Sequence, residues 1–131
     1  MALLELTDEW TLEIGDNLTQ RIEDGSLVLS DETRAVWIDI FDDDRAIDEK
    51  VSFLKEDGAP VGAQSWEWEH EGVVKFGYFA RDEENEDESY ELTTFSVTSS
   101  SYVLMSFYFD AEKSLDWAMK RWRSLKFIPL D

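Results

Sequence analysis

Residues 102–109, Tyr-Val-Leu-Met-Ser-Phe-Tyr-Phe, form the stretch that decides the fold. Seven of these eight residues are apolar or aromatic. Such a composition is typical of a strand that is buried on both faces and lies in the middle of a sheet. We therefore expect a central strand here, with other parts of the chain packed on each side of it.

An amphipathic helix is predicted directly after this strand. Asp110 is a suitable N-cap, because its carboxylate can accept hydrogen bonds from the free amides of a first turn. Pro129 disfavours helix beyond Phe127. Between them, apolar residues recur at intervals of three and four, the pattern of a helix that docks on a core. These residues are Leu115, Ala118, Met119, Trp122 and Leu125.

Alternating apolar and polar residues predict further strands, separated by turn residues such as Asp24-Gly25. A helix from about Arg45 to Glu56, with Ile47, Val51 and Leu54 facing inward, divides these strands into two sets. Before the helix we expect a small antiparallel meander with strands at 10–14, 18–23, 27–29 and 35–41. After it we expect strands at 65–69, 73–79 and 90–97.

The predicted fold class is therefore α+β. An antiparallel sheet of about six to eight strands packs with two α-helices, and the C-terminal helix docks on the sheet. The chain has 131 residues, of which 43% are hydrophobic. This length and composition predict a single domain, residues 1–131, with a sizeable core.

The formal net charge is −19, and it is unevenly distributed. Residues 111–131 carry a net charge of +2, so residues 1–110 carry −21. A field of this sign repels nucleic acid and anionic membrane, and it attracts basic proteins and cations. The alternative interpretation is that the acidity serves only solubility or a salty cytoplasm.

Cysteine is absent, which excludes disulfides, thiolate nucleophiles and cysteine-based metal sites. The first residues, Met1 to Leu6, contain no base, unlike a signal peptide. No apolar run approaches the ~20 residues of a membrane helix. We therefore expect a cytoplasmic protein with no membrane partner; its oligomeric state is left open.

Catalytic and metal-binding motifs are weak. The one histidine, His70, lies at a predicted turn, and we interpret it as a solvated residue and not a catalytic base. Asp42 and Asp44 match the first two ligand positions of an EF-hand loop, but Ala46 and Ile47 break the pattern. We therefore expect no enzyme activity, no cofactor and no specific metal site. A carboxylate-based calcium site or a small acidic hydrolase remains the alternative.

Acidic and aromatic residues are the candidates for binding a partner. Trp66 and Trp68 share one face of a predicted strand, where they belong either to the core or to an open face that receives an apolar partner. Trp117 lies off the main helical stripe and is either a contact residue or a cover over the sheet edge. The acidic candidates are Asp42, Asp43, Asp44, Glu83, Glu84, Glu86, Asp87 and Glu88. The last five lie in an acidic run that we interpret as an exposed hairpin loop.

The order of elements resembles the PsbP-like α/β sandwich, particularly its small bacterial DcrB-type branch. The matching parts are the segment 16–22 after the first strand and a closing helix with Trp117 or Trp122 before Ser124-Leu125-Lys126-Phe127. The resemblance implies a domain that binds protein and has no catalytic residues. Some members look like adaptor chaperones that shield apolar helices of secreted toxins.

Together these features lead us to expect a non-enzymatic module that binds a protein. The partner is expected to be basic or to have an exposed apolar segment, as a bacterial toxin or a secretion partner does. The chain would then be an immunity or adaptor protein, with its acidic regions attracting the partner over distance. An acidic structural domain without specific activity is the remaining alternative.

Overall fold

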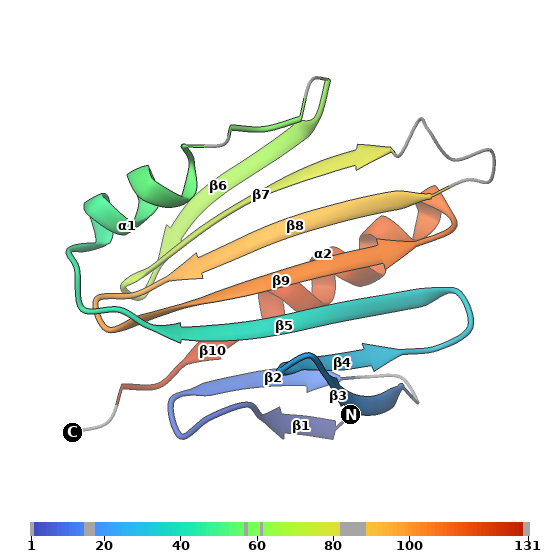
Figure 1. Cartoon of the computed structure of the whole chain (residues 1–131), viewed down its shortest axis with the longest axis horizontal. Coiled ribbons are helices and arrows are strands. Elements are labelled where there is room, and N and C mark those ends of the chain that lie inside the picture. Colours follow the sequence, from blue (N-terminus) through green and yellow to red (C-terminus); the bar gives the residue numbers. More distant parts are fainter. Residues whose placement is uncertain (1, 15–17, 57, 61, 82–88, 130–131) are drawn as a thin grey trace.

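The computed structural model describes residues 2–14, 18–56, 58–60, 62–81 and 89–129, which form two antiparallel sheets and two α-helices (Figure 1). The larger sheet has seven strands in the spatial order β3 (Thr19–Glu23), β4 (Ser26–Ser30), β5 (Arg34–Asp42), β9 (Ser101–Phe109), β8 (Tyr90–Val97), β7 (Val73–Arg81) and β6 (Gln64–His70). The smaller sheet has the order β1 (Ala2–Glu5), β2 (Trp10–Ile14) and β10 (Lys126–Phe127). The helices are α1 (Ile47–Leu54) and α2 (Leu115–Ser124), and a 3-10 turn, η1 (Glu112–Ser114), precedes α2. This arrangement confirms the predicted α+β fold.

β9 is the central strand, as the sequence predicts, and it pairs along its whole length with β5 and β8. The expectation that both of its faces are buried is wrong. Val103, Met105, Phe107 and Phe109 are buried, but the alternate residues are half-buried or exposed. Because successive side chains of a strand point to opposite faces, the large sheet has one covered face and one whose side chains are mostly only half-buried.

The covered face packs against α2 and the small sheet, and Figure 1 shows α2 behind the large sheet. The predicted apolar stripe of the helix is confirmed: Ala118, Met119, Trp122 and Leu125 are buried, and Leu115 is half-buried. The Trp122 indole N–H donates to the Ser96 hydroxyl at 3.2 Å. In the part of the chain that the structure describes, no helix has both the length and the hydropathy needed to cross a membrane.

The small sheet corrects the predicted N-terminal meander. β2 does not pair with β3; it pairs with β1 and with β10, near the other end of the chain. The Trp10 indole N–H donates to the Ser101 hydroxyl at 2.9 Å, and Arg121 donates to the Glu13 carbonyl at 3.1 Å. β2 is thus held by β9 and α2, which are contacts that no local sequence pattern reveals.

The predicted N-cap of α2 is wrong, and α1 begins two residues later than expected. Asp110 does not cap α2, because the 3-10 turn η1 lies between them. The residue that does precede α2, Ser114, makes no side-chain capping bond. α1 begins at Ile47 and not at Arg45, because the Asp43 carboxylate accepts from the backbone N–H of Arg45 and holds this segment outside the helix.

Candidate functional site

The face of the large sheet opposite α2 carries an aromatic surface, which we name the open face. The strand registers place its residues in rows across the central strands. One row is Trp37–Ser106–Thr93–Tyr78, in which each residue lies beside the next on the neighbouring strand. Among the apolar residues in these rows, Val28, Phe76 and Val97 are buried. The solvent-accessible apolar residues of the open face are Trp37, Phe41, Tyr78, Phe95, Tyr102, Leu104 and Tyr108.

These residues are accessible to solvent to different degrees. Phe41 and Tyr108 are each 42% exposed, and the other five are half-buried. Phe41 stacks on Tyr102 with ring centroids 4.9 Å apart, and Phe95 stacks on Phe76 at 5.0 Å. Several of the aromatic rings on this face are therefore packed in stacked pairs and are not isolated on the surface.

The helix α1 borders the open face at one end. The ammonium group of Lys55 lies 5.1 Å from the ring centroid of Phe76 and also pairs with Glu67 on β6. Lys50 is buried and donates from Nζ to the Asp43 carbonyl at 2.6 Å. α1 itself presents Phe53, which is 49% exposed. The helix therefore covers one corner of this face and extends its apolar surface.

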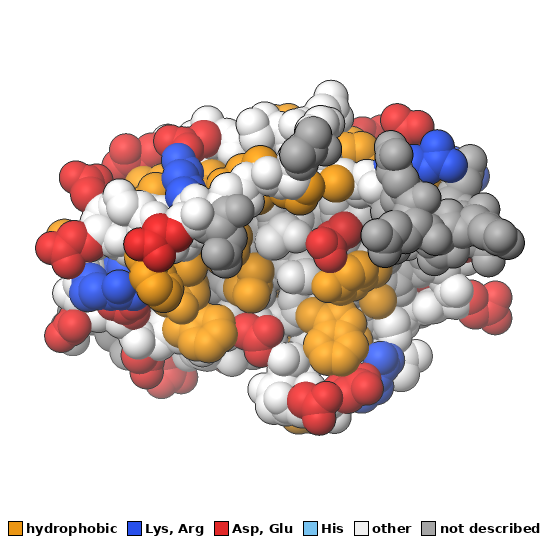
Figure 2. Space-filling view, turned by 45° about the horizontal axis from the view of Figure 1, so that its top comes forward, with side chains coloured by type: hydrophobic (Ala, Val, Ile, Leu, Met, Phe, Trp, Pro, Cys, Tyr) orange, Lys and Arg blue, Asp and Glu red, His pale blue; other side chains and the backbone are white. Residues whose placement is uncertain are grey.

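Carboxylates lie among and around these aromatic side chains. Figure 2 shows hydrophobic side chains in separate groups on this side of the molecule, with acidic side chains between and around them. Asp39 lies in the row of Leu104 and Phe95, and Glu91 lies beside Tyr108. The pKa of Tyr108 is raised by burial and then by the Glu91 carboxylate. The open face therefore combines apolar aromatic side chains with negatively charged carboxylates.

Of the three consecutive aspartates, Asp42 ends β5, and Asp43 and Asp44 lie between β5 and α1. Hydrogen bonds from the Arg45 side chain and backbone lower the pKa of Asp43 to about 2, so this carboxylate is ionised at neutral pH. Arg45 also stacks over Phe53 at 4.6 Å from the ring centroid. Asp43 therefore has a local structural role, in addition to any contribution to the field around the open face.

The three predicted contact tryptophans lie on the covered side of the sheet. Trp66 and Trp68 belong to the edge strand β6, are half-buried and pack against the core. Trp68 lies 4.6 Å from Trp122. Trp117 packs edge-on against Phe107 at 5.8 Å, beneath the guanidinium of Arg34.

The structure therefore does not bring the candidate residues together. The tryptophans 66, 68 and 117 lie around α2, whereas Asp42, Asp43 and Asp44 lie beside α1. Glu83, Glu84, Glu86, Asp87 and Glu88 fall outside the described residues. Sequence reasoning allowed for an open sheet face, but it considered Trp66 and Trp68 for that face and missed the residues that form it. The signal that could have found it is Ser106, which breaks the apolar run on the side of the strand that carries Tyr102, Leu104 and Tyr108.

The residues that were considered for catalysis or metal binding do not form a common site in the described part of the chain. His70 is exposed at the end of β6, with Nε2 3.6 Å from a carboxylate oxygen of Glu71. Among the residues that the structure describes, no three side chains of His, Asp or Glu are grouped as ligands for a metal ion.

One buried cation lies on the covered face. Lys75 is 6% exposed, and its Nζ donates to the carbonyl oxygens of Trp122 and Leu125 at 2.9 and 2.8 Å. These carbonyls belong to the end of α2, where free acceptors and the helix dipole favour a cation. Burial nevertheless lowers the pKa of Lys75 to about 8. Lys75 therefore fastens the end of α2 to β7.

Neither a protein-family model nor a curated protein sequence matches this chain. The open face must therefore be interpreted from its own chemistry.

Proposed function

We propose that the chain is a non-enzymatic protein-binding module, and that its open face binds the apolar side of a basic segment of another protein. One observation carries the proposal. The large sheet is covered by α2 on one face only, while its opposite face presents aromatic residues across four adjacent strands within an acidic surround.

The dimensions of the open face suit a helix or an extended segment. Neighbouring strands are about 4.8 Å apart, so the row from Trp37 to Tyr78 spans about 15 Å. An α-helix with its side chains is about 10 Å wide. Exposed aromatic groups of this extent on a soluble protein commonly mark a surface that another molecule covers.

The charge favours a basic partner. The net charge of −19 attracts cationic proteins over distance and accelerates their encounter, whereas it repels acidic ones. A bacterial toxin or a secretion partner with an amphipathic, lysine-rich segment has this chemistry. The chain would mask such a segment as an immunity or adaptor protein, which is also the role implied by its resemblance to the DcrB-type branch.

A defined peptide tests this proposal. The probe is a synthetic amphipathic helix of about 20 residues, with leucine and tryptophan on one face and lysine on the other. We expect it to perturb the NMR amide signals of β5, β8 and β9 more than those of α2. A matched peptide with glutamate in place of lysine is the control. Perturbation centred on α2, or equal binding of both peptides, would contradict the proposal.

A further inference from the structure

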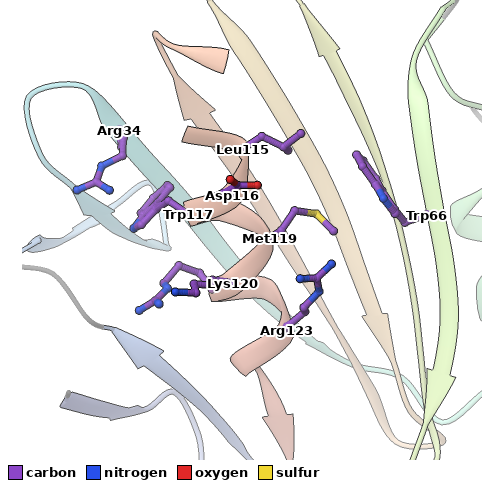
Figure 3. A pocket seen from close by; sticks show the side chains of 9 residues that line it. Arg34, Trp66, Leu115, Asp116, Trp117, Met119, Lys120 and Arg123 are labelled. Atoms are coloured by element: carbon purple, nitrogen blue, oxygen red, sulfur yellow. The ribbon is translucent and has the colours of Figure 1, made fainter. Parts of the chain in front are cut away.

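A hollow of about 670 Å³ runs along the outer side of α2, on the face of the molecule opposite the open face. Figure 3 shows Trp117 and Arg34 on one side of the helix, and Arg123 and Trp66 on the other. None of these residues takes part in the proposed binding by the open face, so this hollow is a separate candidate site.

Two buried donors in the hollow lack acceptors. The indole N–H of Trp117 and the Nε–H of Arg121 have no hydrogen-bond partner among the described residues. The buried indoles of Trp10 and Trp122, in contrast, donate to the hydroxyls of Ser101 and Ser96. Buried polar groups in native proteins are nearly always paired, so two neighbouring exceptions require an explanation.

The two donors belong to neighbouring positions of α2, and both side chains make other contacts. They are four residues apart on α2, a spacing that places side chains next to each other on one face of a helix. The Trp117 ring is fixed between Phe107 and the Arg34 guanidinium. Arg121 is fixed by its Nη1, which donates to the Glu13 carbonyl at 3.1 Å.

The local charge identifies the kind of acceptor. Residues 111–131 have a net charge of +2, whereas residues 1–110 have −21. Lys120, Arg121 and Arg123 all line the hollow, and Asp116 is the one acid among its described lining residues. Arg and Lys offer N–H donors and no acceptor, so an anionic oxygen completes their hydrogen bonds better than a neutral one does.

We propose that this hollow binds a small oxyanion, a carboxylate or phosphate group, whose oxygen accepts from the Trp117 indole N–H and the Arg121 Nε–H. Because both donor atoms are closed off from solvent, the oxygen reaches them only when the side chains that line the hollow shift. Lys120 supplies positive charge at the entrance, since its side chain is exposed.

The indole N–H resonance of Trp117 tests the proposal directly. The wild-type protein is titrated with inorganic phosphate and separately with acetate, with chloride at the same ionic strength as the control. We expect a saturable downfield shift of the Trp117 indole proton with at least one of the two anions, and comparison of the two titrations shows which group is preferred. The indoles of Trp10 and Trp122, which are already paired, should not shift.

Three variants separate specific binding from general electrostatics. W117F removes the indole N–H and keeps a ring against Phe107, with the Arg121 Nε–H resonance as the reporter. R121M removes the second donor, with the Trp117 indole as the reporter. K113M is the matched control, because Lys113 is exposed and outside the hollow and carries the same charge as Arg121.

We expect the affinity for the anion to fall about tenfold or more in W117F and R121M, which corresponds to about 1.4 kcal/mol, and to change little in K113M. The proposal is overturned if neither anion gives a saturable shift, if chloride gives the same shift, or if K113M loses as much affinity as R121M. Because the first test uses the wild-type protein, it decides the matter even if W117F does not fold.

Discussion

The indole ring of Trp122 lies against Gly77. A Cβ atom at position 77 would lie 2.9 Å from Cη2 of Trp122 and 2.9 Å from the carbonyl oxygen of Thr93. Both distances are too short for a carbon atom that cannot move. The lack of a side chain at position 77 of β7 therefore allows α2 to approach the sheet this closely. Glycine is required at this position by packing, and not by the backbone conformation.

The first prediction concerns this contact. G77A should lower the free energy of unfolding by about 1–3 kcal/mol, the usual cost of overpacking a core. Urea denaturation followed by tryptophan fluorescence measures it. In the W122F background, which lacks Cη2, the same substitution should cost less, because only the close contacts with Thr93 and Thr94 remain. Equal costs in both backgrounds would show that Trp122 does not limit the approach.

The second prediction concerns the buried amine of Lys75. Burial lowers the pKa of Lys75 to about 8 from the ordinary value of 10.5. Between these pH values the unfolded chain therefore binds more protons than the folded protein does. The contribution of Lys75 to the free energy of unfolding therefore increases as the pH rises from about 8 to 10.5. The total increase is at most about 3 kcal/mol.

The comparison with K75M isolates this effect. Other groups titrate in the same range, but they are shared by both proteins. The difference in unfolding free energy, wild type minus K75M, should increase from pH 8 to pH 10. A constant difference would mean that hydrogen bonds to the carbonyls of Trp122 and Leu125 restore an ordinary lysine pKa.

The third prediction concerns the rate at which a basic partner binds. With the lysine-rich amphipathic peptide as probe, stopped-flow fluorescence should show an association rate constant that falls about tenfold or more between low and high salt, because salt screens the attraction by the net charge. The dissociation rate constant should change less. An association rate that does not depend on salt would mean that the acidic surface does not guide the encounter.

The parts of the fold that depend on local pattern could be predicted from the sequence. The run from Tyr102 to Phe109 indicates the central strand, and the stripe from Leu115 to Leu125 indicates the docked helix; both are confirmed. The small sheet could not be predicted. Phe127 pairs with Trp10 across more than a hundred residues, and β10 has only two residues, so no periodicity marks it.

The candidate site was harder to predict for a different reason. A period of two shows which residues of a strand share a face, but not which face a helix will cover. Trp66 and Trp68 do share a face, and it is the one beside α2. The aromatic residues of the opposite face, such as Trp37 and Tyr108, became apparent only when the register of four strands was known.

The central claim is that the open face binds the partner, and paired substitutions test it most directly. F41S and Y108S each remove an aromatic side chain that is 42% exposed on this face. I22S removes an apolar side chain that is 71% exposed on the edge strand β3 and faces the other side of the sheet. All three substitutions preserve the net charge.

The measurement is the dissociation constant of the lysine-rich amphipathic peptide for each variant, with the unfolding free energy measured in parallel to confirm that each protein is folded. The account predicts that F41S and Y108S each weaken binding by about fivefold or more, about 1 kcal/mol for a lost aromatic contact, while I22S binds as tightly as the wild type. Wild-type affinity in both F41S and Y108S, or an equal loss in I22S, would contradict it.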